Sequence, residues 1–556
     1  MLDFFVRNTR RRNDPLADAE AAATWVAELK AEFGSAAHER VTDLVSQAVT
    51  DGASPDAGRI DAVLRLNLDT ASLHQQLGLQ YLMNGRLPKL LEEQVRSQIL
   101  DYGQAFISFY RLASQPGSAA SPAQVALMLS RSLFFLGERA RWQFYRHRAP
   151  QDGFWLQVNE HLRCAEQWKA ESLPICLFNE ERGTTVQDQF LILQMLATLT
   201  SGNLSTRQLN FSHELLRLVS DRMTLHAGVQ ETSSFVVDLL ADQPAHRPRA
   251  QAAGGEYRGW STADMVEILH GWAGSLEGGR TPEELRRLIE PGIDATLLRV
   301  LCREWAPRQM LFARAERVSV KGRQIEVAHR LPVLHRLIRK PEEEARSRAA
   351  QAGEGFEEAT DIRIYGFVTT RRRDRMSALA PAAEAVALHD EFAKWELDNI
   401  SLTGLGVTFE ALGNEWAQLG TLLGIRHADH PAWQLGLVRR LKRQQGNRVY
   451  LGIELLSDRP VAAAIRPADT RVLDPSLAPE LVWSGGLISL FVALGKGGKT
   501  VNALILPLSA YTLGKQYVMS ARGKYFLVAL GKVAEKGLDW CLAEVELVRT
   551  LQGPEG

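Results

Sequence analysis

Cysteine is scarce in this sequence of 556 residues, and its four cysteines stand far apart, at Cys164, Cys176, Cys302 and Cys541. No CxxC pair occurs, so the spacing of a structural zinc site or of a dense disulfide framework is absent. This usage fits the reducing environment of the cytoplasm, where we expect the protein to reside.

Long apolar runs and an excess of one charge are also lacking. No run of about 18 apolar residues occurs, so we expect no membrane span. The first residues lack a basic region followed by a long apolar stretch, so we expect no secretory signal. Lys plus Arg and Asp plus Glu are equal, at 65 each, so no overall positive charge favours a nucleic-acid partner.

Signatures of catalysis and metal binding are missing as well. The sequence contains no GxSxG motif and no Cys/His nucleophile pattern, so we expect no catalytic residues and no enzyme activity. Residues 495–500 (GKGGKT) imitate a P-loop, but Ala493 replaces its first Gly, and we expect a hairpin turn. His427 and His430 are followed by Pro431, which favours a loop over a metal site. We expect no metal and no cofactor.

Helical spacing dominates the first 242 residues. Ser121 and Gln124 form a capping box around Pro122, which suits the first position of a helix. Behind this box, apolar residues recur every three or four positions, which predicts one buried stripe: Val125, Met128, Leu129, Leu133 and Leu136. We expect residues 1–242 to form an α-helical bundle that serves as a scaffold.

Two linkers separate this region from the rest. Residues 243–256 and 341–360 are polar or rich in Glu, Arg, Ala, Gly and Pro, which is typical of linkers. Between them we expect a small, mostly helical domain over 257–340, with a second capping box at Thr281. It should end in a hairpin over 318–327, in which Lys-Gly supplies the turn.

From residue 361 onward the apolar period changes from helical to alternating. Short strands separated by turn signals predict a six-stranded β-barrel over 361–458. The alternating segment 362–368 leads into this region, and six strand-like segments follow it, at 384–389, 394–399, 406–409, 419–425, 433–441 and 450–456. A second barrel-like domain is expected over 463–550, because its ending echoes the end of the first. The predicted fold class is therefore α+β multidomain.

One pair of short motifs in the first barrel points to a ligand. Arg371, Arg372 and Arg375 lie in an RxxxR pattern, and residues 399–404 (NISLTG) follow about two dozen residues later. Together they match RxxxR followed by [D/N]xSxxG. Over about residues 362–457 the sequence resembles the PilZ domains, bacterial β-barrels that bind cyclic di-GMP.

The resemblance implies a role for each residue of the pair. Arg371 and Arg375 would bind the phosphates and guanines, since a guanidinium suits both, while Arg372 would add a phosphate contact or remain solvated. Asn399, Ser401 and Gly404 would form the barrel-side wall. Asn399 stands where Asp is more usual, and an amide accepts less strongly from guanine N–H groups. Whether one or two nucleotides bind stays open. The second barrel carries neither motif.

The leading hypothesis is a cyclic di-GMP receptor that transmits nucleotide binding through its helical region to partner proteins. The PilZ resemblance implies control of motility, pili, adhesion or exopolysaccharide. The alternative is an adaptor whose barrels contact proteins and bind no nucleotide. RNA binding is disfavoured by the neutral charge and by the lack of interleaved aromatic and basic residues.

Overall fold

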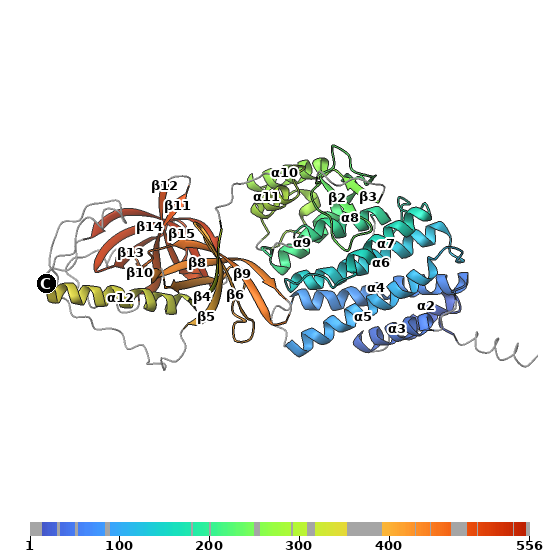
Figure 1. Cartoon of the computed structure of the whole chain (residues 1–556), viewed down its shortest axis with the longest axis horizontal. Coiled ribbons are helices and arrows are strands. Elements are labelled where there is room, and N and C mark those ends of the chain that lie inside the picture. The colour runs from blue at the N-terminus through green and yellow to red at the C-terminus, as the bar shows by residue number, and fades with distance from the viewer. Residues whose placement is uncertain are drawn as a thin grey trace, which may run out of the picture. The chain divides into compact units, whose positions relative to one another are not determined.

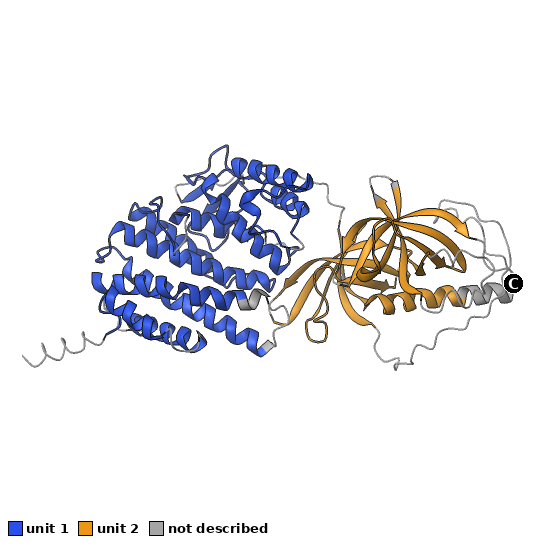
Figure 2. Cartoon of the chain, turned by 180° about the vertical axis from the view of Figure 1, so that it is seen from behind, with its two compact units in different colours: residues 1–312 blue, residues 313–556 orange. Residues whose placement is uncertain are grey.

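The computed structural model describes residues 14–551, except 30–33, 51–53, 84–88, 179–181, 200–201, 250–255, 291–292, 309–316, 353–391, 429, 445, 469–485, 497–498 and 538. The chain divides into two compact units, Met1–Phe312 and Ala313–Gly556 (Figure 2). The first unit is mostly helical, and the second contains two closed β-barrels. This arrangement confirms the expected fold class.

The first unit is built from antiparallel helices stacked side by side (Figure 1). They are α2 (Ala19–Leu29), α3 (Gly34–Thr50), α4 (Ala57–Met83), α5 (Lys89–Ala113), α6 (Pro122–Tyr145), α7 (Phe154–Gln167), α8 (Val186–Ala197), α9 (Thr206–Val219), α10 (Ala263–Glu277) and α11 (Ala295–Glu304). Among the described residues, no helix is long and apolar enough to cross a membrane.

Helix α6 lies where the sequence predicts it and for the predicted reason. The Ser121 side chain accepts from the Gln124 backbone N–H. In turn, Oε1 of the Gln124 side chain accepts from the Ser121 backbone N–H, as a capping box requires. All five residues of the predicted stripe are at most 2% exposed. The amphipathic pattern therefore set the face that α6 buries.

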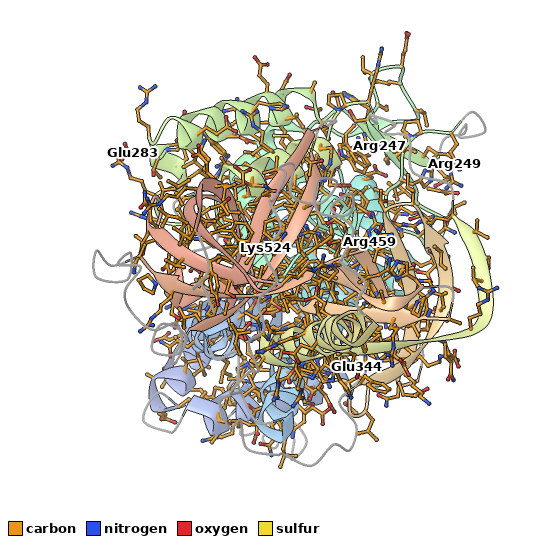
Figure 3. The ribbon with its side chains drawn as sticks, turned by 90° about the vertical axis from the view of Figure 1, so that its left-hand side faces the viewer. Arg247, Arg249, Glu283, Glu344, Arg459 and Lys524 are labelled. Atoms are coloured by element: carbon orange, nitrogen blue, oxygen red, sulfur yellow. The ribbon has the colours of Figure 1, made fainter. Side chains whose placement is uncertain are left out.

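A small sheet interrupts the helices, which was not expected. It has the order β1–β3–β2 and consists of β1 (His226–Ala227), β2 (Phe235–Asp238) and β3 (Tyr257–Trp260). The predicted linker 243–256 therefore connects two paired strands. Arg247 and Arg249 of this segment are labelled in Figure 3. Arg247 stacks 3.9 Å from the centre of the Phe235 ring and donates to the Glu304 carbonyl, 2.8 Å away. These contacts tie the segment to the end of α11.

The region after this segment packs on the helices. Trp260 and Trp305 are fully buried in the same apolar core as α6 and α8. The Trp305 indole donates to Thr198 Oγ1 at 3.0 Å. The expected capping box at Thr281 gives only a short 3₁₀ turn, Glu283–Leu285, with no side-chain cap. Burial of Leu285 holds this turn in place.

The first barrel of the second unit has six strands, as predicted. They are β4 (Val318–His329), β5 (Ala393–Ser401), β6 (Gly404–Glu410), β7 (Leu422–His427), β8 (His430–Arg443) and β9 (Arg448–Ser457), in the closed order β4–β5–β6–β9–β8–β7. The predicted strands 362–368 and 384–389 lie outside the described residues.

Two elements predicted within residues 318–352 differ in the structure, a hairpin and the start of a linker. The expected hairpin over 318–327 is the single strand β4. Gly322, with a φ of 81°, lies where the register against β5 shifts, so it forms an irregularity in a strand rather than a turn. The expected linker 341–360 begins inside helix α12 (Leu331–Ala352), which contains Pro341.

The second barrel repeats the topology of the first. Its strands are β10 (Val461–Pro467), β11 (Leu487–Lys496), β12 (Lys499–Pro507), β13 (Gln516–Ala521), β14 (Lys524–Lys536) and β15 (Trp540–Leu551), in the order β10–β11–β12–β15–β14–β13. In each barrel the closed order is therefore first, second, third, sixth, fifth and fourth. This confirms the expected second barrel, although β10 was not predicted.

The two barrels share an apolar core with α12. It combines outward-facing residues of β7 and β8, the buried side of α12, and outward-facing residues of β10, β11, β12 and β15. Its fully buried members include Leu435 and Leu437 of β8 and Leu490, Val492 and Ile505 of the second barrel. Two ion pairs add to this contact, Arg522 with Glu342 at 3.0 Å and Arg439 with Glu535 at 2.8 Å.

Candidate functional site

The described half of the motif pair forms a tight hairpin at one end of the first barrel. Ser401 pairs with Gly404 across a two-residue turn, and the Ser401 hydroxyl donates to the Gly404 carbonyl at 3.1 Å. A Cβ on Gly404 would overlap the backbone carbonyl oxygen of Ile453, so only glycine fits there. Arg371, Arg372 and Arg375 lie outside the described residues.

A row of outward-facing positions crosses four strands beside this hairpin. Asn399 on β5 pairs with Gly406 on β6, Gly406 with Gly452 on β9, and Gly452 with Arg440 on β8. The two glycines lie between Asn399 and Arg440, and a Cβ on Gly452 would lie 3.2 Å from the Cβ of Arg440. A Cβ on Gly406 would lie 2.5 Å from Asn399 Nδ2 and 2.6 Å from the Tyr450 hydroxyl. Asn399 and Tyr450 therefore lean over the space that glycine leaves.

Two β-bulges determine which side chains reach this surface, which we call the glycine-floored face. In β5 the register shifts between Leu397 and Asn399, and Leu397 and Ile400 pack in the barrel interior. The two residues between them, Asp398 and Asn399, therefore both point outward. Asn399 Nδ2 donates to Asp398 Oδ2 at 2.7 Å.

The second bulge acts in the same way on β8. The register shifts between Val438 and Arg440, while Val438 and Leu441 belong to the interior core. Arg439 and Arg440 are therefore both placed outside, so a single strand brings two guanidinium groups to the face.

Arg439 is shared between two carboxylates from different strands. Its Nε donates to Glu454 of β9 at 2.6 Å, and its Nη2 donates to Glu535 of β14 at 2.8 Å. Glu454 is the backbone partner of Gly404, so this ion-pair cluster lies next to the Ser401–Gly404 hairpin. The second barrel thus reaches the edge of the glycine-floored face.

The chemistry of this face suits a flat, anionic ligand with hydrogen-bonding edges. Guanidinium groups pair with phosphate oxygens or with guanine O6 and N7. Amide, carboxylate and hydroxyl groups can address the remaining donors and acceptors of a base. Among the described residues, no cluster of His, Cys, Asp and Glu could hold a metal ion.

Comparison with protein families identifies the family to which this barrel belongs. Residues 336–461 match the family described as "Cyclic-di-GMP receptor FimW, middle PilZ domain". Residues 20–231 match "Cyclic-di-GMP receptor FimW, N-terminal domain". Together the matches span more than half of the chain. The chain belongs to the FimW family of cyclic di-GMP receptors.

The family assignment confirms the PilZ resemblance that the two motifs predicted. Cyclic di-GMP is the ligand of this family of receptors. The PilZ match begins within α12 and so excludes β4, which nevertheless closes the barrel. No curated protein and no solved structure matches the chain.

The sequence analysis missed several residues of the glycine-floored face: Asp398, Gly406, Arg439, Arg440, Tyr450 and Gly452. A signal for the bulges was present, since Leu-Asp-Asn-Ile and Val-Arg-Arg-Leu each place two polar residues where alternation allows one. The glycines carry no such signal, because their partners across the sheet depend on the register.

Two stretches that imitate other sites lie at the ends of strands. Lys496 pairs with Lys499 across the hairpin between β11 and β12, where the sequence predicts a turn. His427 and His430, which were expected in a loop, end β7 and begin β8 and pair with each other.

Proposed function

We propose that this chain is itself a cyclic di-GMP receptor and that its PilZ domain binds the nucleotide on the glycine-floored face. The observation that carries the proposal is the row Asn399–Gly406–Gly452–Arg440, beside the Ser401–Gly404 hairpin, in which polar side chains gather over two glycines. A guanine that packs against this row meets these polar groups with its edge.

The arginines of the RxxxR pattern complete the proposed site. Arg371 and Arg375 bind phosphate and guanine, and Arg372 adds a phosphate contact. Asn399, Ser401 and Gly404 form the wall on the barrel side, as the motif pair predicts. Arg440 adds a guanidinium group from β8. Each charge-assisted bond contributes about 1.5–3 kcal/mol, so two such contacts separate a micromolar ligand from one that does not bind.

The helical unit is the proposed output of the receptor. Its stacked helices offer surfaces for protein partners, and no catalytic signature accompanies them. By analogy with the family, the regulated processes are motility, pili or exopolysaccharide, and the proposed compartment is the cytoplasm. The first unit and the PilZ domain fall within the same receptor family, which supports their acting together.

Titration of the purified full chain with cyclic di-GMP tests the proposal. We expect wild-type binding, a loss of at least about tenfold in Arg371→Ala, and a smaller loss in Ser401→Ala. Arg459→Ala is the matched control, because Arg459 is an exposed arginine outside the glycine-floored face, between β9 and β10. It removes the same charge and should bind like the wild type.

Each result has a distinct meaning. Equal losses in Arg371→Ala and Arg459→Ala would point to non-specific attraction of an anion and not to a site. Absence of wild-type binding at tens of micromolar nucleotide would overturn the receptor proposal and leave the adaptor hypothesis.

A further inference from the structure

The bulge in β5 places a carboxylate where the motif itself supplies an amide. Asp398 is the extra residue of this bulge, so it points outward together with Asn399 and not into the barrel. Both side chains are half-buried. The Asn399 amide donates to Asp398 Oδ2 at 2.7 Å, which fixes the carboxylate beside the glycine-floored face.

The chemistry of guanine distinguishes the two side chains. The Watson–Crick edge of guanine carries two adjacent donors, N1–H and the 2-amino group. An ionised carboxylate accepts at both of its oxygens, whereas an amide presents one acceptor and one donor group to the same edge. Asn399 donates one N–H to Asp398 Oδ2 and so holds the carboxylate in place. The second carboxylate oxygen, Oδ1, can then accept from the base.

We propose that Asp398 reads the Watson–Crick edge of guanine and that Asn399 acts as its positioning residue. This inference rests on the proposed function, since it assigns the selectivity of the same nucleotide site. The pair would accept N1–H and the 2-amino group together. It would therefore discriminate against bases that lack either donor, hypoxanthine and adenine among them.

The matched variants come from the same strand. Asp398→Asn keeps the size of the side chain but removes its charge and one of its acceptors. Glu396→Gln is the control, because Glu396 is also an outward carboxylate on β5 but is held by Arg448 instead of by Asn399. Asn399→Asp is the third variant. It removes the donor that holds Asp398 and sets two like charges side by side.

The measurement is the affinity of the full chain for cyclic di-GMP and for its hypoxanthine analogue, which lacks only the 2-amino groups. We expect the wild type to prefer the guanine nucleotide by about tenfold or more. In Asp398→Asn this preference should fall to about threefold or less, mainly through weaker binding of cyclic di-GMP. Glu396→Gln should keep the wild-type preference, and Asn399→Asp should bind the guanine nucleotide more weakly.

The contrary outcomes separate this inference from the proposed function. If Asn399→Asp binds more tightly, Asn399 itself reads the base and the assignment of Asp398 is wrong. If Asp398→Asn and Glu396→Gln lose the same amount, only overall charge matters, which also overturns it. Both results leave the receptor intact. If the wild type binds neither nucleotide, the proposed function fails, and the inference fails with it.

Discussion

The two barrels share one topology but use the equivalent outer face in opposite ways. In the first barrel, the second and third strands present Asn399 opposite Gly406, two residues from their hairpin. In the second barrel, the pair at the same distance from the hairpin is Leu494 opposite Val501. The same strands continue with Val492 opposite Ala503 and Leu490 opposite Ile505.

These apolar pairs explain why the second barrel carries no comparable face. Val492, Ala503, Leu490 and Ile505 are fully buried in the core shared with α12 and the first barrel. A surface covered in this way cannot admit a ligand. The same barrel topology therefore supports two kinds of outer face on these strands. Glycine and polar residues give a ligand face, whereas branched apolar residues give a packing face.

The largest effect is expected from weakening the shared core. Leu437→Ala removes a fully buried side chain between the barrels, and such truncations cost about 2–5 kcal/mol. Hydrogen exchange should rise in β7 and β8 and also in β11 and β12, because both barrels line the cavity. Leu513→Ala, at a leucine that is 65% exposed, is the control and should change little. A rise confined to the first barrel would show that the barrels are stable independently.

The ligand face can be converted toward the packing face with one substitution. Gly406→Val places in the first barrel the residue type found at Val501 of the second. Its Cβ would displace the Asn399 side chain and the Tyr450 hydroxyl, both within 2.6 Å of that atom. We expect affinity for cyclic di-GMP to fall about 100-fold, equivalent to the loss of one or two polar contacts.

The control for this conversion is Val501→Gly in the second barrel, which should leave nucleotide affinity unchanged. Circular dichroism of both variants checks that the barrels still fold. Wild-type affinity in Gly406→Val would mean that the nucleotide does not use the glycine floor.

The packing between the barrels should also depend on pH through His335 of α12. Burial, together with the positive charge of Arg339, lowers the pKa of His335 to about 4, although a hydrogen bond with the Ala463 backbone and the charge of Glu343 oppose this shift. Because the folded pKa lies below the unfolded value of about 6.5, the folded state disfavours the proton. Stability is therefore complete above pH 6.5 and declines as the pH falls toward 4.

This decline amounts to about 2 kcal/mol at pH 5. Urea unfolding of wild type and His335→Gln, compared between pH 7.5 and pH 5, isolates the contribution of this histidine. The variant should lose less stability than the wild type over that range. Identical pH dependence in the two proteins would show that His335 is not held neutral in the folded state.

Local patterns in the sequence predict the parts of this molecule that depend on local physics. The Ser121 capping box starts α6, and the alternation of β5 to β9 gives strands near their predicted positions. The Asn399–Gly404 motif ends in the tight Ser401–Gly404 hairpin, whose turn depends only on nearby residues.

Long-range pairing could not be predicted in the same way. Strand β4 pairs with β5 across more than sixty residues of sequence, and nothing near Val318 indicates that partner. The row from Asn399 to Arg440 likewise depends on the register of four strands. The shared core is a further example. The sequence alternates over Trp433–Leu437, which predicts one buried face, but residues 433–438 are all buried because β8 is covered on both faces.

The smallest expected effect tests whether the packing barrel influences the ligand barrel. Arg439 forms ion pairs with both Glu454 and Glu535. The three side chains are 28–46% exposed, so each ion pair contributes at most about 1 kcal/mol to stability. Glu535→Gln removes one of the two carboxylates that neutralise this arginine at the edge of the glycine-floored face. We expect unchanged folding and about two- to fivefold tighter binding of cyclic di-GMP, measured at low ionic strength, because the local charge becomes more positive.

Glu342→Gln is the matched control, since Glu342 pairs with Arg522 of the second barrel away from that face. Equal affinities in Glu535→Gln and Glu342→Gln would mean that β14 only packs against the first barrel. Tighter binding in Glu535→Gln alone would mean that the second barrel sets the affinity of the first. By linkage, nucleotide binding would then weaken the Arg439–Glu535 contact by the same factor.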